Sequence, residues 1–104
     1  MKSLSARDRV TRGAAFLDER YPGWEKHIDP FILNINNCFN CILGQLYFGF
    51  NDGMGLLHIS ESDCEFYGFF SANTLAYDDL REAWLNEIAS RQLQPELQVI
   101  SESK

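Results

Sequence analysis

The chain has 104 residues, of which 45% are hydrophobic and 23% are charged, and these values are typical of one globular domain. It has an odd number of cysteines, three, and no apolar run near the roughly 20 residues that cross a bilayer, so we expect a reduced cytoplasmic protein without structural disulfides. The net charge is −6, and no Lys or Arg lies between Lys26 and Arg81, which argues against direct binding of nucleic acid.

The segment before Pro22 predicts a helix that begins at Ser5. Ser5 and Asp8 have the spacing of a capping box, in which two side chains satisfy free amides at the helix start. A narrow apolar stripe then follows the helical period and consists of Val10, Ala14, Leu17 and Tyr21. Pro22-Gly23 ends this helix.

The next stretch, "GWEKHIDPFILNI" (residues 23–35), predicts one helical turn and then a connector. The turn ends at Asp29, because a residue that precedes a proline avoids helical backbone angles. The "FILNI" segment has no visible pairing partner, so we expect an extended connector rather than a strand.

A central helix is expected from Cys38 to about Phe50, with Asn36 or Asn37 as its N-cap. Its apolar residues run nearly all the way around a helical wheel, and a helix of that kind is buried. The glycines in "NDGMG" (residues 51–55) then indicate a turn.

Two further helices are predicted after this turn. Ser60 and Asp63 have capping-box spacing and open a short helix that ends near Gly68. The last helix, residues 74–92, pairs Glu87 with Arg91 at i, i+4 and has one apolar face made of Tyr77, Leu80, Trp84 and Ile88. The prediction is a compact all-α single domain over residues 1–104, with three main helices and two short ones around the central buried helix. Residues 1–4 and 93–104 are expected to be flexible tails.

Several segments resemble one family of proteins when they are taken together and in order. They are "RGAAFLDERYPGW", "CILGQLY", "GFNDGMGLL", "YGF" and "YDDLREAWLNEI". This pattern resembles a family of small, uncharacterised proteins of actinobacteria and their phages, over about Arg9 to Arg91. The resemblance implies a small cytoplasmic protein, often phage-encoded, and an accessory protein that binds and inhibits a host or defence component would fit such a source. It implies no reaction, cofactor or catalytic residue.

The pair Cys38 and Cys41 has three interpretations. With His58 and Cys64 it gives the spacing C-x2-C-x16-H-x5-C, which is compatible with a tetrahedral zinc site. Two thiols at a helix start also suit redox chemistry, although no strand–helix–strand pattern precedes them. We favour the third interpretation, in which the cysteines pack in the core and no metal is bound.

No pattern in the chain indicates an enzyme. There is no G-x-S-x-G turn, P-loop or dinucleotide-binding fingerprint. A Cys–His dyad between Cys41 or Cys64 and His27 or His58 stays open, because sequence does not show which side chains are close. We expect no enzymatic activity and no cofactor; the alternative is a small structural or regulatory protein that zinc stabilises through Cys38, Cys41, His58 and Cys64.

Half of the fourteen aromatic residues lie between Tyr47 and Phe70. One interpretation packs all of these rings around the central helix. The other exposes Tyr67, Phe69 and Phe70 within an acidic rim formed by Glu61, Asp63 and Glu65, as in protein interfaces with an aromatic centre and a polar border. On that basis the leading hypothesis is a non-enzymatic protein-interaction module, whose partner is a basic protein or a second copy of the chain.

Overall fold

The described part of the chain, residues 5–102 with side chains to residue 92, consists of helices joined by turns in this computed structural model. No strand forms in these residues, so the prediction of an all-α domain is confirmed. In chain order the elements are α1 (Ala6–Arg20), η1 (Trp24–His27), α2 (Ile42–Tyr47), α3 (Phe50–Leu57), α4 (Glu61–Phe66), η2 (Thr74–Ala76) and α5 (Tyr77–Glu102).

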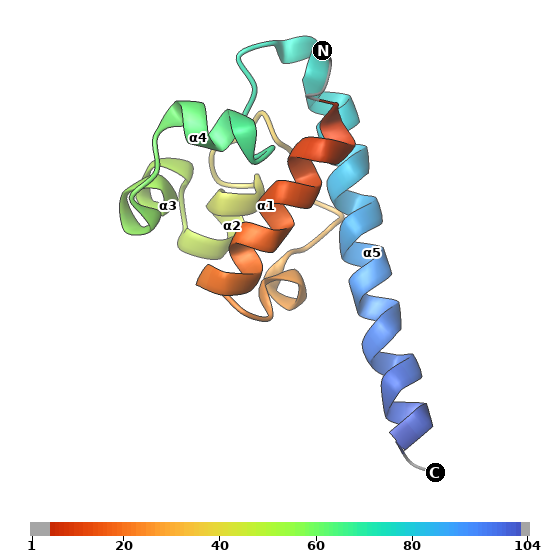
Figure 1. Cartoon of the computed structure of the whole chain (residues 1–104). Coiled ribbons are helices and arrows are strands. Elements are labelled where there is room, and N and C mark those ends of the chain that lie inside the picture. Colours follow the sequence, from red (N-terminus) through yellow and green to blue (C-terminus); the bar gives the residue numbers. More distant parts are fainter. Residues whose placement is uncertain (1–4, 103–104) are drawn as a thin grey trace.

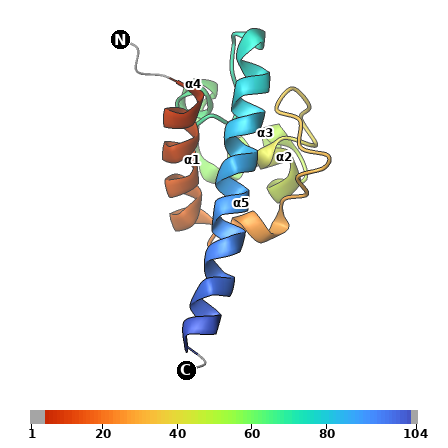
Figure 2. The ribbon, with the colours of Figure 1, turned by 90° about the vertical axis from the view of Figure 1, so that its right-hand side faces the viewer.

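Helices α1 and α5 pack side by side, and α2, α3 and α4 lie together on one side of this pair (Figures 1 and 2). Helix α5 extends well beyond the other helices at its C-terminal end (Figure 1). The residues expected as a C-terminal tail are thus helical as far as Glu102, and residues 1–4, 103 and 104 lie outside the described part. Within that part, no helix combines the length and the hydrophobicity needed to cross a membrane.

One half of the capping box predicted at the start of α1 is present. The Ser5 side chain accepts a hydrogen bond from the Asp8 amide at 3.1 Å. The residues of the predicted stripe that fall inside α1 are all buried, and they are Val10, Ala14 and Leu17. One face of α1 therefore enters the core.

Stacked aromatic rings form the centre of this core. The Trp84 ring on α5 lies edge-on to Trp24, with centroids 5.5 Å apart, and parallel to Phe69 at 5.7 Å. The indole nitrogen of Trp84 donates to the Gly68 carbonyl at 2.8 Å, and that of Trp24 donates to Asp18 at 3.1 Å. Each buried indole N–H thus has a partner, as buried polar groups require.

The central helix expected over residues 38–50 does not form as one element. Within this range only α2 and the first residue of α3, Phe50, are helical. The "NDGMG" segment, which the sequence predicts to be a turn, lies inside α3. Gly49 separates the two helices with φ +156°, in a conformation that side chains other than glycine rarely adopt. The apolar run indicated burial correctly for α2, whose Ile42, Leu43 and Leu46 are buried, but it carried no information about the break.

The last two helices form where the sequence predicts them, although α5 begins at Tyr77, after η2, and extends to Glu102. Ser60 and Asp63 form the complete capping box at the start of α4. In α5, Leu80, Trp84 and Ile88 are buried as predicted, and Tyr77 is half-buried. Arg91 bonds Glu87 at 2.8 Å and also makes a two-pronged ion pair with Asp18 at 2.8 and 3.0 Å. This second pair ties α5 to α1.

Candidate functional site

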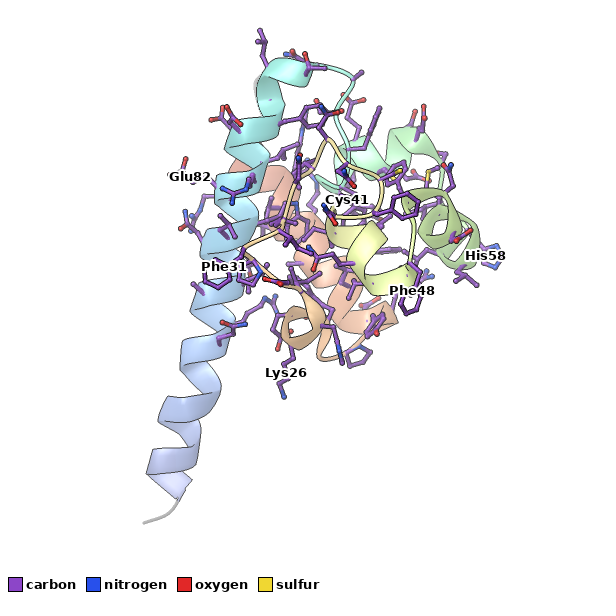
Figure 3. The ribbon with its side chains drawn as sticks, turned by 180° about the vertical axis from the view of Figure 1, so that it is seen from behind. Lys26, Phe31, Cys41, Phe48, His58 and Glu82 are labelled. Carbon is purple, nitrogen blue, oxygen red and sulfur yellow. The ribbon has the colours of Figure 1, made fainter. Side chains whose placement is uncertain are left out.

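Three exposed apolar side chains gather around the N-terminal and C-terminal ends of α2. Ile32, Phe39 and Phe48 have exposed fractions of 48%, 65% and 86%, and all three line one open hollow of about 350 Å³ together with His27, Gly44 and Gln45. We call this set of three side chains the apolar face. Figure 3 shows Phe48 pointing away from α2, whereas Phe31 lies apart from Phe48.

A smaller hollow of about 170 Å³ adjoins the first. Phe39 and Phe48 line both, so the two rings stand between a mainly apolar hollow and a more polar one. The smaller hollow is also lined by Cys38 and by Asp52, an acidic residue in the first turn of α3. The two hollows therefore offer an apolar surface next to a negative charge.

Close backbone packing sets the position of Phe39. A Cβ atom on Gly44 would lie 2.4 Å from the Cys38 carbonyl oxygen and 2.8 Å from the Phe39 Cα. Only glycine lets the turn at residues 38–40 lie this close to α2. The turn is capped by Asn37, whose side-chain oxygen accepts from the Phe39 and Asn40 amides at 2.8 and 3.0 Å.

Phe48 occupies the C-cap of α2 with φ +66° and ψ +26°. This left-handed conformation is an outlier for a bulky side chain, and glycine is the usual residue at such a position. The ring gains little packing in return, because it is almost fully exposed. Backbone strain of this kind is found most often at functional sites.

The irregular segment that carries Ile32 is held firmly against the helices. The Gln45 side chain accepts from the Asp29 amide at 2.6 Å and donates to the Asp29 and Asn40 carbonyls at 3.2 and 2.9 Å. On the other side, Arg81 of α5 donates to the Leu33 carbonyl at 2.8 Å. The Leu33 and Ile35 side chains are buried. The apolar face is thus largely pre-organised, which lowers the entropic cost of binding.

The aromatic residues predicted to contact a partner are placed differently. The prediction that Phe69 contacts a partner is wrong, because this ring is fully buried against Trp84. Tyr67 and Phe70 are half-buried: Tyr67 stacks on Phe16 at 4.5 Å, and Phe70 lies 5.9 Å from Phe50. Tyr67 and Phe69 are thus packed inside the molecule, but against Phe16 of α1 and Trp84 of α5 and not around the expected central helix.

The acidic rim proposed with those rings is used in local structure. Asp63 closes the α4 capping box with Ser60, and Glu65 accepts from the Ala72 amide at 3.2 Å. Glu61 is exposed in the first turn of α4. Two of the three carboxylates therefore already have partners within the chain.

The four residues of the zinc alternative are not brought together. Cys41 and Cys64 are buried, whereas Cys38 is exposed and His58 is exposed at the C-cap of α3. Among the described residues, no group of three or more His, Cys, Asp or Glu side chains is arranged to hold a metal ion. The Cys41 sulfur instead accepts a hydrogen bond from the Gly44 amide at 3.3 Å and caps α2.

Burial is the main influence on the pKa values of the two buried thiols, Cys41 and Cys64. It raises the pKa of the Cys64 thiol to about 12, with smaller contributions from the Asp63 carboxylate and from Cys41. It also raises the pKa of Cys41, although the bond from the Gly44 amide acts in the opposite direction. Both thiols are protonated near neutral pH, and a protonated thiol is a poor nucleophile.

No protein family, curated protein or solved structure matches the chain. The candidate site therefore depends on geometry. Sequence reasoning missed Ile32, Phe39 and Phe48, although two of them carried a signal. Phe39 stands among asparagines at positions 36, 37 and 40, and Phe48 directly precedes a glycine, so both sit where a turn exposes the side chain.

Proposed function

We propose that this chain is a non-enzymatic protein-interaction module that binds a protein partner through the apolar face. The observation that carries the proposal is Phe48, a large apolar ring that is 86% exposed and held in a left-handed conformation. Such a residue contributes little to folding, whereas exposed aromatic rings are common energetic centres of protein interfaces. An accessory protein that binds and inhibits a host or defence component would use a surface of this kind.

The surroundings of Phe48 support the same proposal. Phe39 and Ile32 extend the apolar surface around it, and Gln45 fixes the segments on which they lie. The acidic segment from residue 27 to residue 80 favours a basic partner.

Site-specific crosslinking tests this proposal. We would place the photo-reactive amino acid p-benzoylphenylalanine at position 48 and, as a matched control, at position 75, because Leu75 is 85% exposed and lies on η2, away from both hollows. In lysate of cells that naturally express the chain, we expect one crosslinked protein from position 48 and none from position 75. An excess of the wild-type chain should prevent formation of this crosslinked product by competition. The product should also be absent when the same chain carries Phe39→Ala. Equal products from both positions, or none from either, would contradict the proposal.

A further inference from the structure

We propose that the partner presents an arginine to the apolar face, with its guanidinium stacked on the Phe48 ring above the smaller hollow and paired with the Asp52 carboxylate. This inference rests on the proposed function and specifies the chemistry of the same site. Three observations support it. Arginines of the chain stack on several of its other aromatic rings, and in the described part of the chain Asp52 is exposed without a cationic partner and no Lys or Arg lines the two hollows.

The chain repeatedly places its own arginines over aromatic rings, two of them at least partly exposed and one, Trp24, buried. Arg12 lies over Phe66 at 4.0 Å, Arg20 over Phe16 at 4.9 Å, and Arg91 over Trp24 at 5.3 Å. A guanidinium within about 6 Å of a ring centre is attracted to the negative face of the ring. In residues 5–92, these three contacts do not include Phe39 or Phe48, so both rings of the apolar face are open to a cation from outside.

Asp52 supplies the negative charge. It is exposed, it lines the smaller hollow, and its carboxylate lies beside Gly49, where an added Cβ would be 3.3 Å from Oδ2. Both ion pairs among the described side chains involve Arg91, so Asp52 has no cationic partner there. A planar guanidinium can stack on a ring and bond a carboxylate at the same time, which the ammonium of lysine does less well.

Among the described residues, no Lys or Arg lines either hollow. No Lys or Arg lies between Lys26 and Arg81, whereas Asp29 and Asp52 flank the apolar face. A symmetric contact through this face would bring the carboxylates of two copies into one interface whose hollows no described Lys or Arg lines, and like charges brought together across an interface are unfavourable. Charge complementarity therefore favours a different, basic partner over self-association.

Two matched peptides test the inference on the full ¹⁵N-labelled chain. The probes are the amide of N-acetyl-Leu-Arg-Leu and its counterpart with citrulline, which keeps the shape of arginine and lacks its charge. With the arginine peptide, we expect saturable NMR shifts at the amides of Phe39, Gly49 and Asp52, and about tenfold weaker binding of the citrulline peptide. Phe48→Ala and Asp52→Asn should each weaken binding of the arginine peptide by about tenfold.

Phe31→Ala and Asp78→Asn serve as matched controls, because Phe31 is 91% exposed but lines neither hollow and Asp78 is an exposed carboxylate on α5. Both should bind like the wild type. Equal binding of the two peptides, or wild-type affinity in Asp52→Asn, would overturn the inference. If binding then still required Phe48, the proposed function would stand. If the peptides cause no NMR shifts and position 48 gives no crosslink, both the inference and the proposed function are wrong. A dimer of the chain alone that Phe48→Ala abolishes would also overturn the inference, because a second copy would then occupy the apolar face.

Discussion

Phe48 combines an exposed ring with an unfavourable backbone conformation. An L-residue in the left-handed region costs about 1–2 kcal/mol relative to a relaxed backbone, and the ring is too exposed to recover this energy by packing. A residue that lowers stability at the centre of the apolar face is better explained by binding than by folding.

We therefore predict that Phe48→Gly raises the free energy of unfolding by up to about 1 kcal/mol, because glycine adopts this conformation without strain, while its greater freedom in the unfolded chain offsets part of the gain. The same variant should no longer bind the arginine peptide. Urea unfolding and the NMR titration measure the two effects. His58→Gly, at the other left-handed C-cap, should also gain stability but keep binding. A lower stability of Phe48→Gly would mean that the ring supports the fold.

The three cysteines should differ sharply in reactivity. Cys38 is exposed, whereas Cys41 and Cys64 are buried and have raised pKa values. We predict that iodoacetamide modifies Cys38 alone in the folded chain and all three cysteines in urea, because both burial and a protonated thiol slow alkylation. Mass spectrometry of chymotryptic peptides measures each site, because cleavage after Phe39 and Phe50 separates the three cysteines. Modification of Cys64 as fast as Cys38 under native conditions would show that the α4 region opens readily.

At the scale of elements, prediction succeeded where the sequence contains local signals. The Ser5 and Ser60 caps and the 3.6-residue stripes of α1 and α5 depend on neighbours within one or two turns. The region from 38 to 57 lacks such signals, because its residues are apolar on every side. Its division into α2 and α3 depends on Gly49 and on the packing of the 38–40 turn against Gly44, which are tertiary features.

Two helical glycines differ in how closely other parts of the chain pack against them. A Cβ on Gly13 in α1 would lie 2.1 Å from the Tyr67 carbonyl oxygen and 3.1 Å from the Trp84 ring, whereas a Cβ on Gly55 in α3 would meet nothing within 4 Å. We predict that Gly13→Ala lowers the free energy of unfolding by about 2 kcal/mol or more through overpacking. Gly55→Ala should raise it by about 0.5–1 kcal/mol through helix propensity. Urea unfolding of both variants measures the contrast, and a neutral Gly13→Ala would show that α1 and the Tyr67 turn can move apart.

At the scale of the whole molecule, the fold class was more predictable than the site. Amphipathic stripes and caps specify an all-α domain, but the choice of which aromatic rings stay exposed is made by the core. Phe69 fills the space beside Trp84 and Tyr67 covers Phe16, so the residues that looked most like an interface are mostly internal. The apolar face instead arises where Phe39 and Phe48, nine residues apart, meet across α2. Sequence alone does not show such a meeting.

The buried thiols also predict how the stability of the whole domain depends on pH. Burial raises the pKa of Cys64 from 9.0 to about 12, so above pH 9 the unfolded chain releases this proton while the folded chain retains it. Stability falls wherever the folded state binds more protons than the unfolded state. This contribution is complete below about pH 9 and is lost progressively as the pH rises toward about 12.

We therefore predict that the free energy of unfolding, measured in urea with a reducing agent, falls between about pH 8 and about pH 11. Cys64→Ala should be less stable than the wild type near neutral pH, because it leaves a small cavity, yet its stability should fall less steeply with pH. A residual slope is expected from Cys41 and Tyr47, whose pKa values burial also raises. Parallel curves for the two proteins would mean that the Cys64 thiol ionises as readily in the folded chain as in the unfolded one, and that α4 does not seal it from water.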